Sequence, residues 1–482
     1  MLARATIVWF RNDLRIIDNP ALWQAAQRGP VMPVFIHSPE DAPYGYAGGA
    51  SAWFIHESVT DLACSLRKLG TPLVIRRGPV LSVLQDLVKE TSADALYFNA
   101  RYEAPSRAID ADIVQHFRAS GLAVERAHAG MLMKPGAVLS EKQQSYKVFT
   151  AFWRQFMRQS VRKPLPVPAH LVPVSDQVQS LSLDEIGLLP SVPWYDKLSE
   201  YWQPGEQGAM ARWSHFLEHS LSGYASGRDF PAHDHASRFS PYFASGALSP
   251  RWVWHQLLAM REAGKIPDTD IEGFLRQLAW REFAYDNLVH VPEMVHAPMR
   301  PEFNQFPWRT DHDALRTWQQ GRTGYPLIDA GMRQLWETGW IHNRVRMVAA
   351  SFLVKHLLIS WTEGAAWFKD TLVDADVANN TMGWQWVTGC GFDASPFFRI
   401  FNPVTQGEKF DPEGNYVRRW VPELRQLHPR FIHRPWEAPT HVLRDAGLEL
   451  GVNYPLPMVD HAAARARALL AFQSIQNRNF PT

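Results

Sequence analysis

Three groups of residues in the second half of the sequence have the types and spacing to do chemistry. The first is the segment 227–241, where serine hydroxyls, arginines and free backbone amides precede a proline that can start a helix. Such a helix start suits a phosphate group. The alternative is an ordinary capped helix with proline in its first turn.

The second group lies on a helix expected around residue 280. Gln277, Trp280 and Arg281 stand at positions i, i+3 and i+4, so an amide, an indole and a guanidinium share one face. Together these side chains could bind a planar polar ring. The alternative is a partly buried helix face that carries one structural arginine.

The third group combines a long helix with two acidic residues beyond it. Asn343 and Met347 are four residues apart and share a face, and Asp374 and Asp376 follow later. A buried pair between Arg346 and one of these carboxylates could polarise the edge of a cofactor, since burial strengthens such a pair. A purely structural ion pair is the alternative.

The elements that must position these groups begin with an α/β region. Short apolar runs alternate with helical stretches, which indicates a doubly wound parallel sheet of the Rossmann-like kind. No G-x-G-x-x-G follows the first run, so a dinucleotide held by that phosphate loop is not expected here. The expected strands are Thr6–Phe10, Val31–His37, Leu73–Arg76, Ala95–Asn99 and Leu122–Arg126, and the expected helices include Ser51–Leu69 and Val80–Thr91.

The pattern changes along the rest of the chain. Seven prolines between Pro164 and Pro204 indicate an interdomain connection. Beyond it, apolar and aromatic residues recur at three- and four-residue spacing, which predicts an all-helical domain with helices at Ile271–His290, Tyr325–Thr338 and Trp340–Trp361. We therefore expect an α/β domain over 1–130, a linker over 131–205 and a helical domain over 206–482.

Composition excludes several classes of protein. The formal net charge is +1, so nucleic-acid binding would need a local basic patch. Two cysteines cannot build a four-cysteine metal site or a disulfide framework, and they favour a reducing cytoplasm. The most apolar stretch, Met347 to Trp361, is too short to span a membrane and carries a lysine.

Taken together, the motifs closely resemble the photolyase/cryptochrome family over almost the whole chain. No single block is decisive, but their order and spacing are specific. The segments that carry the resemblance are 8–15 (VWFRNDLR), 237–242 (SRFSPY), 280–283 (WREF), 324–330 (GYPLIDA), 339–344 (GWIHNR), 383–386 (GWQW), 398–403 (FRIFNP) and 406–410 (QGEKF).

The resemblance implies an N-terminal α/β antenna domain and a C-terminal helical domain that holds FAD, with reduced anionic FAD as the working form. It also implies a photoreduction chain of Trp384, Trp361 and Trp308, running from the flavin to the surface; their spacing alone does not show that they touch. Asn380 would face flavin N5 and cannot supply a carboxylic proton. The implied FAD-binding residues are Tyr224, Ser237, Arg238, Phe239, Ser240, Arg281, Asn343, Arg346, Asp374, Asp376 and Asn380.

Within that family the residues favour light-driven repair of cyclobutane pyrimidine dimers in DNA. Enzymes for (6–4) photoproducts carry paired histidines on one helix, where this chain has Asn343 and Met347, and neither is a general acid at neutral pH. The implied lesion and DNA contacts are Arg228, Gln277, Trp280, Met347, Trp386 and Arg399. A cryptochrome-type photoreceptor and a (6–4) photolyase are the alternatives, and a light-independent nucleotide-binding protein is a third.

Two departures from the family pattern affect the details. Gln277 stands where many bacterial photolyases have glutamate, so it can hydrogen-bond thymine without adding charge. Tyr102 and Glu103 are followed by Ala104, Pro105 and Ser106, where the usual folate-antenna pattern has Asn and Glu. We expect 5,10-methenyltetrahydrofolate as the antenna, with partly different contacts. UV-damaged DNA is the expected partner, and a monomer is the expected state.

Overall fold

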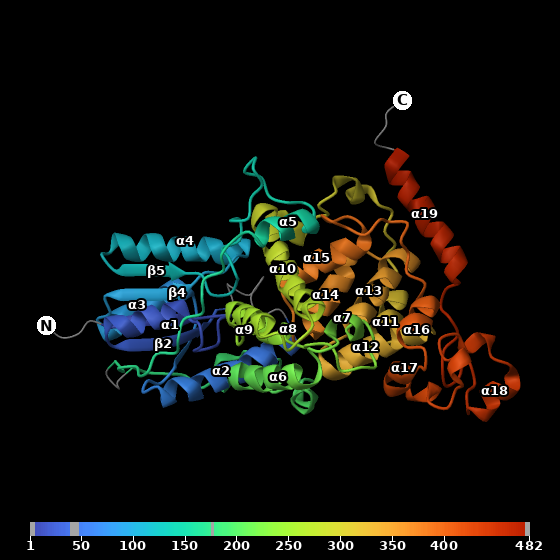
Figure 1. The fold of residues 1–482 in the computed structure, drawn as a ribbon, viewed down its shortest axis with the longest axis horizontal. Coiled ribbons are helices and arrows are strands. Elements are labelled where there is room, and N and C mark those ends of the chain that lie inside the picture. The colour runs from blue at the N-terminus through green and yellow to red at the C-terminus, as the bar shows by residue number, and fades with distance from the viewer. Residues whose placement is uncertain (1–4, 39–47, 175–177, 478–482) are drawn as a thin grey trace. The chain divides into compact units, whose positions relative to one another are not determined.

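A computed structural model describes residues 5–38, 48–174 and 178–477, and its N-terminal part contains a five-stranded parallel sheet (Figure 1). The strand order is β3-β2-β1-β4-β5, and every pairing is parallel. This order places β1 in the centre, with the chain winding outward in both directions. The strands are β1 Thr6–Phe10, β2 Val31–His37, β3 Val74–Arg77, β4 Ala95–Asn99 and β5 Ala123–Ala127.

Helices cover both faces of this sheet, because alternate residues of the strands point to opposite sides. Val8 and Phe10 pack with apolar residues of α1 (Pro20–Arg28) and α2 (Gly49–Lys68). Ile7 and Trp9 pack on the other side with α3 (Val80–Thr91) and α4 (Ala104–Ala119). The predicted doubly wound α/β sheet is confirmed, with strand ends shifted by one residue at β3 and β5.

The chain divides into two compact units. Unit 1 comprises residues 1–222, 237–292 and 373–377, and unit 2 comprises 223–236, 293–372 and 378–482. Beyond the sheet domain, the helices of unit 1 are α5 Phe149–Phe156, α6 Gly205–His219, α8 Ser240–Ser245, α9 Pro250–Ala263 and α10 Asp268–His290. The expected boundaries at 130 and 205 stay a prediction.

Unit 2 is built from helices and short turns. No helix among the described residues is both long and apolar enough to cross a membrane. Its helices are α7 Tyr224–Gly227, α11 His312–Gln319, α12 Pro326–Thr338, α13 Asn343–Ser351, α14 Trp361–Thr371, α15 Val377–Thr388 (which begins in the last residue of unit 1), α16 Pro403–Phe410, α17 Asn415–Trp420, α18 Thr440–Asp445 and α19 His461–Asn477.

The expected continuous helix Trp340–Trp361 is wrong. Helix α13 passes into a π-helical turn, η6 (Phe352–His356), and Leu358 then adopts a left-handed φ of 56° that ends the helical path. Ser360 caps the next helix by accepting a hydrogen bond from the Thr362 amide. The apolar periodicity of the sequence continues across the break, so this pattern does not reveal the local change of backbone geometry.

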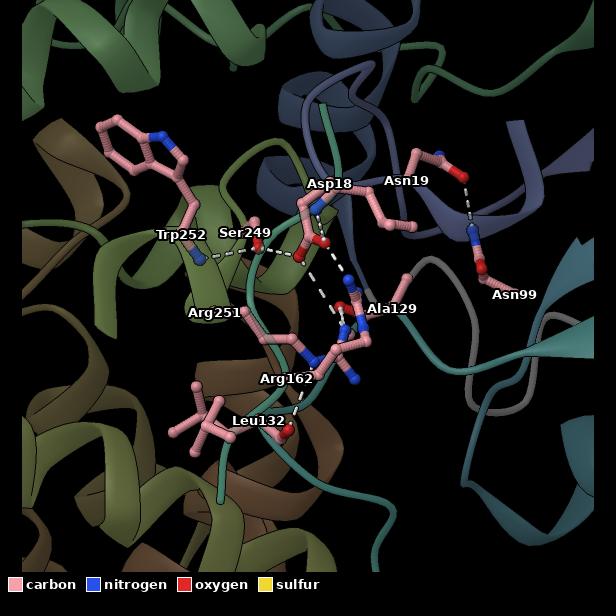
Figure 2. A network of polar contacts seen from close by, with 12 residues as sticks. Asp18, Asn19, Asn99, Ala129, Leu132, Arg162, Ser249, Arg251 and Trp252 are labelled. Atoms are coloured by element: carbon pink, nitrogen blue, oxygen red, sulfur yellow. Dashed lines mark hydrogen bonds and ion pairs between the residues drawn. The ribbon is translucent and has the colours of Figure 1, made fainter. Parts of the chain in front are cut away.

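A buried polar network joins distant segments of unit 1 (Figure 2). The fully buried carboxylate of Asp18 accepts hydrogen bonds from the Ser249 hydroxyl at 2.6 Å and from the Arg162 guanidinium at 2.7 Å. Arg251 lies 3.9 Å from the same carboxylate and donates to the Leu132 carbonyl at 3.2 Å. The segment that follows the sheet is thereby tied to the loop before α1 and to the start of α9.

Replacing Asp18 with asparagine should lower the free energy of unfolding by about 3 kcal/mol, because it removes the carboxylate charge that faces the buried Arg15 and Arg251 guanidinium groups. Burial alone would raise the pKa of Asp18, but the Arg15 guanidinium and the Ser249 hydrogen bond hold it below its ordinary value. The stabilisation is therefore present above the unfolded-state pKa and disappears as the pH falls through the lower folded-state pKa. The difference between the two proteins should shrink in strong acid.

Urea unfolding followed by circular dichroism, at neutral pH and in acid, measures this difference. Asp86→Asn is the matched control, since Asp86 is 66% exposed and lies 3.9 Å from Lys89. That change should alter the stability by less than about 0.5 kcal/mol. Equal effects of the two substitutions would contradict the assigned role of Asp18.

Candidate functional site

A polar cavity of about 50 Å³ lies within unit 1, at the carboxyl ends of β1 and β4. In open α/β sheets this edge is where ligands bind. Two of the residues predicted to bind FAD, Arg281 and Asp376, line the cavity. The lining residues are Asn12, Ala100, Arg101, Tyr102, Glu103, Gly130, Met131, Phe243, Ala244, Arg281, Tyr285, Ala375, Asp376 and Val377.

Hydrogen bonds fix the side chains of this cavity. Arg281 on α10 donates to the Gly130 carbonyl at 2.7 Å. One turn later on the same helix, the Tyr285 hydroxyl donates to Asp376 at 2.6 Å. Burial, reinforced by the Asp376 charge, raises the pKa of Tyr285 well above its ordinary value, so the phenol stays protonated as a donor. Sequence reasoning found Arg281 and Asp376 but missed Tyr285.

The group on α10 that is expected to contact the lesion packs against a neighbouring helix. The Trp280 ring stacks on Phe149 of α5 with centroids 3.7 Å apart and planes 8° from parallel. Phe149 is 1% exposed and Trp280 is half-buried, so Phe149 supports the indole from inside. The Gln277 amide donates to the Gly273 carbonyl at 3.3 Å. The expected shared face of Gln277, Trp280 and Arg281 thus sits on a rigid helix pair.

The expected phosphate-binding segment precedes α8 in unit 1. Arg238 adopts a left-handed φ of 56°, which non-glycine residues rarely do and which is common at functional sites. Phe239 is buried, whereas Ser240 is exposed and no described side chain caps the start of α8. The backbone amide of Phe239 lies 3.5 Å from the Ser237 hydroxyl.

The residues preceding this segment belong to unit 2. Tyr224 is buried in α7, and the Arg228 guanidinium lies 5.5 Å from its ring centroid. Asp229 pairs with Arg344 of α13 at 2.5 Å, and Arg344 also lies 4.4 Å from the Phe410 ring. The segment 223–236 is therefore tied to the helix that carries Asn343 and Met347.

Helix α13 brings the next predicted residues together. The exposed Asn343 amide lies 3.7 Å from the Met347 sulfur, so these two side chains share a face as expected. Arg346 lies in unit 2, whereas Asp374 and Asp376 lie in unit 1. Their pairing therefore stays a prediction.

A tryptophan at the core of unit 2 depends on a glycine for its place. Trp384 of α15 is 2% exposed, and its ring packs on α14 at Gly364, where a Cβ atom would lie 2.1 Å from the indole. Asn380, one turn earlier on α15, donates to the Ala365 carbonyl of α14 at 3.1 Å. Trp361 opens α14 three residues before Gly364, on the same helix face. Trp361 and the glycine against which Trp384 packs therefore lie about one turn apart on α14.

The third tryptophan of the expected chain lies closer to solvent. Trp361 is 3% exposed, whereas Trp308 is half-buried. The backbone amide of Arg309 donates to the Leu358 carbonyl at 2.7 Å, which places Trp308 beside the segment leading into Trp361. Trp384 and Trp361 are thus buried and Trp308 is partly open to solvent, and the electron-transfer chain that the resemblance implies stays a prediction.

Two of the proposed DNA-contacting residues of unit 2, Trp386 and Arg399, lie near the end of α15 and in the segment that links α15 to α16. Trp386 is half-buried on α15, and its carbonyl accepts a hydrogen bond from the Ser395 amide at 3.1 Å. Arg399 is exposed in the linking segment, next to Phe398, which is 68% exposed. An exposed aromatic ring beside a guanidinium is suited to contacts with bases and phosphates.

One buried donor tests whether a flavin suits these residues. The indole N–H of Trp384 is buried and has no hydrogen-bond acceptor among the described residues. Native proteins satisfy most buried donors, so this indole N–H is available to a ligand acceptor. Asn380 and Trp384 are one turn apart on the same face of α15, so an amide and an indole meet at one place. These residues fit a polar aromatic cofactor.

Replacing Gly364 with alanine should displace the Trp384 ring and lower the free energy of unfolding by about 2 kcal/mol. It should also slow the light-driven flavin reduction that the resemblance implies, because the Trp384 ring is displaced. Gly383→Ala is the control for stability, since no described atom lies within 4 Å of its Cβ position. Urea unfolding and illumination under a reductant measure both effects. A Gly364 variant as stable and as readily photoreduced as the parent would contradict this packing.

Sequence reasoning missed the residues that support the site from behind. Phe149 and Tyr285 lie inside ordinary helical patterns and carry no local signal. Gly364 did carry one, because a glycine within a helix costs about 1 kcal/mol relative to alanine and often marks close packing.

Comparisons with known proteins cover both parts of the chain. Residues 6–169 match the family described as DNA photolyase, and residues 274–474 match the FAD binding domain of DNA photolyase. The first match contains the parallel sheet, and the second contains Trp280, Asn343 and the three tryptophans discussed above.

Individual relatives match along nearly the full length. The chain is 46% identical over 473 residues to the deoxyribodipyrimidine photo-lyase of Agrobacterium fabrum, with 98% of each chain covered. It is 37% identical to cryptochrome-2 of Arabidopsis thaliana, covering 96% of this chain and 78% of the relative. The crystal structure of a bacterial class III photolyase from Agrobacterium tumefaciens superposes with a TM-score of 0.96 at 45% identity, covering 99% and 98% of the two chains.

Proposed function

We propose, because this chain belongs to the photolyase/cryptochrome family, that it repairs cyclobutane pyrimidine dimers in DNA with the energy of light. The observation that carries the proposal is the match to a deoxyribodipyrimidine photo-lyase over 98% of both chains. Reduced FAD, when bound and excited by light, supplies an electron to the dimer and receives it back after the ring opens. The protein's own side chains bind the cofactor and the damaged DNA, orient them relative to each other, and exclude water from the site.

Different residues of this chain are proposed to contact different parts of the FAD cofactor. We assign the phosphates and ribityl chain to Tyr224, Ser237, Arg238, Phe239 and Ser240. The exposed hydroxyl of Ser240 and the uncapped amides of α8 support this assignment. The remaining proposed FAD contacts are Arg281, Asn343, Arg346, Asp374, Asp376 and Asn380.

The lesion and the DNA backbone would use a second set of residues. Trp280 offers an aromatic face held in place by Phe149, and Gln277 offers an amide one turn away. Met347 and Trp386 complete the proposed lesion contacts, and Arg228 and Arg399 the phosphate contacts. Phosphate contacts provide most of the affinity of such proteins for DNA and make it salt-dependent.

The absence of an acid on one helix face favours the cyclobutane dimer as substrate. Asn343 and Met347 lie 3.7 Å apart, and neither can protonate a (6–4) photoproduct at neutral pH. A cyclobutane dimer needs only electron injection and return. Purified protein with chemically reduced FAD should therefore repair dimer-containing oligonucleotides in blue light and leave (6–4) oligonucleotides unchanged.

This illumination experiment separates the alternatives. Chromatography of the digested oligonucleotide should show the dimer lost in light and retained in darkness. Flavin that is reduced by light without any loss of dimer would support the signalling photoreceptor, which the 37% identity to a plant cryptochrome keeps as the second candidate. A colourless preparation that binds no flavin would support a light-independent nucleotide-binding protein.

The antenna is proposed as 5,10-methenyltetrahydrofolate. Arg101 and Glu103 pair at 2.9 Å just beyond the carboxyl end of β4, immediately before Ala104, where the usual folate pattern is lost. Contacts from this ion pair could replace the missing ones. Absorption spectra of the chromophores released from the purified protein test the assignment. We further propose that the protein acts as a monomer in the cytoplasm, which gel filtration and fractionation can check.

A further inference from the structure

A lysine lies fully buried in the π-helical turn that follows α13. Lys355 is 0% exposed, and among the described residues its ammonium contacts a backbone carbonyl and an aromatic ring but no carboxylate. Burial, and then the nearby Arg399 guanidinium, lowers the pKa of Lys355 to about 7. Buried lysines are rare and costly unless they are paired. The contacts of this ammonium should therefore show what it does.

The Lys355 ammonium makes two contacts, and both are with residues of the segment that links α15 to α16. Nζ donates to the Arg399 carbonyl at 3.0 Å and lies 5.1 Å from the centroid of the Phe397 ring. Lys355 lies within the π-helical turn η6, a backbone geometry that is rare and is often found at functional sites. A second hydrogen bond joins the same elements, from the Phe401 amide to the Ser351 hydroxyl at 3.4 Å.

The linking segment is anchored on its inner side and open on its outer side. Phe397 is 2% exposed and stacks on Phe472 with centroids 4.3 Å apart. The next two residues, Phe398 and Arg399, are exposed. Both are aimed outward from a backbone that Lys355 holds from beneath.

We propose that Lys355 is a positioning residue for DNA binding, which holds the backbone at Arg399 so that the side chains of Phe398 and Arg399 are presented to DNA. The inference rests on the proposed function, because Arg399 is assigned there to DNA. Lys355 itself touches neither DNA nor cofactor in this assignment. Lys355 acts only through its hydrogen bond to the Arg399 carbonyl, so the proposal can be tested without measuring repair.

The first test removes the ammonium with little change of volume. Lys355→Met should weaken binding to dimer-containing duplex about tenfold, as expected for loss of a charged hydrogen bond. The repair rate at saturating DNA, the flavin content and the melting temperature should stay at parental values or higher, because an apolar chain replaces a buried charge. Lys89→Met, at a 79% exposed lysine of unit 1, removes the same charge and should leave the affinity unchanged.

A double-mutant comparison separates positioning from general stability. If Lys355 acts through the side chains of Phe398 and Arg399, adding Lys355→Met to a variant that already carries Phe398→Ala and Arg399→Ala should weaken its DNA binding no further. Lys355→Gln, which keeps an N–H donor, should recover most of the affinity. Additive losses, or an unchanged affinity in Lys355→Met, would overturn the proposal.

A measurement without DNA keeps the inference separate from the proposed function. Trypsin should cut after the exposed Arg399 faster in Lys355→Met than in the parent, because the backbone there loses its tether. An unchanged cutting rate would refute the tether whatever the protein repairs. If Lys355→Met does not fold, Ser351→Ala removes the second tether without a change of charge, and it should weaken DNA binding and speed cutting in the same way. A parent that binds dimer DNA but repairs nothing in light would refute the proposed function alone.

Discussion

Replacing Trp384 with phenylalanine should slow light-driven reduction of the bound flavin by roughly 100-fold while leaving repair by chemically reduced protein unchanged. Phenylalanine keeps the shape of the packing against Gly364 but is a far poorer electron donor than an indole. Trp384 is the most deeply buried of the three tryptophans and shares a face of α15 with Asn380, so we expect it to be the first donor.

Absorption spectra recorded during illumination with an external reductant measure this rate. Repair of a dimer oligonucleotide is then measured with protein reduced in advance by dithionite. Trp318→Phe is a matched control, because Trp318 is also buried and its ring centroid lies 6.3 Å from that of Trp384, yet it is no member of the expected chain. If repair and photoreduction fell by the same factor in Trp384→Phe, the tryptophan would serve the site in some other way.

Replacing Trp280 with alanine should weaken binding to dimer-containing DNA by roughly 30-fold and leave binding to undamaged DNA nearly unchanged, since stacking on one base is worth about 1–3 kcal/mol. The indole is half-buried and is held flat against Phe149, so little ordering is needed when a base stacks on it. The effect should therefore appear as lost discrimination between damaged and undamaged DNA.

Arg228→Ala provides the contrasting case. An arginine that contacts phosphate should weaken binding to both DNAs alike and lower the slope of affinity against salt by about one. Fluorescence anisotropy with matched oligonucleotides at several salt concentrations measures both variants. The assigned roles would be contradicted if Trp280→Ala weakened binding to both DNAs equally. They would also be contradicted if Arg228→Ala weakened binding to damaged DNA alone.

Much of the local structure could be predicted from the sequence, because its causes are local. The β-branched and apolar run Val31–His37 is a strand with the expected ends, and Val80–Thr91 is a helix with the expected ends. Parallel pairing followed from the alternation of strands with helices, since parallel neighbours need a crossover between them. The motif order was specific enough to indicate the family before any contact was known.

Contacts between distant residues could not be predicted, because no local rule relates their positions. The hydrogen bond from Tyr285 to Asp376 spans 91 residues, and the stack of Trp280 on Phe149 joins two helices whose periodicities are independent. The break at Leu358 was also missed, because apolar spacing reports which residues are buried and not whether the backbone between them stays α-helical.

The amino-acid order alone specified strands, helices, side-chain chemistry and family, all of which depend on neighbours within a few residues or on motif order. The three-dimensional packing determined which side chains are fixed in place and which residues contact them. It placed Trp384 against Gly364, turned Lys355 towards the carbonyl of Arg399, and buried Asp18 among arginines. These contacts depend on the volume, burial and charge of segments that meet only when the chain is folded. The spacing of residues along the sequence does not report which distant segments will meet.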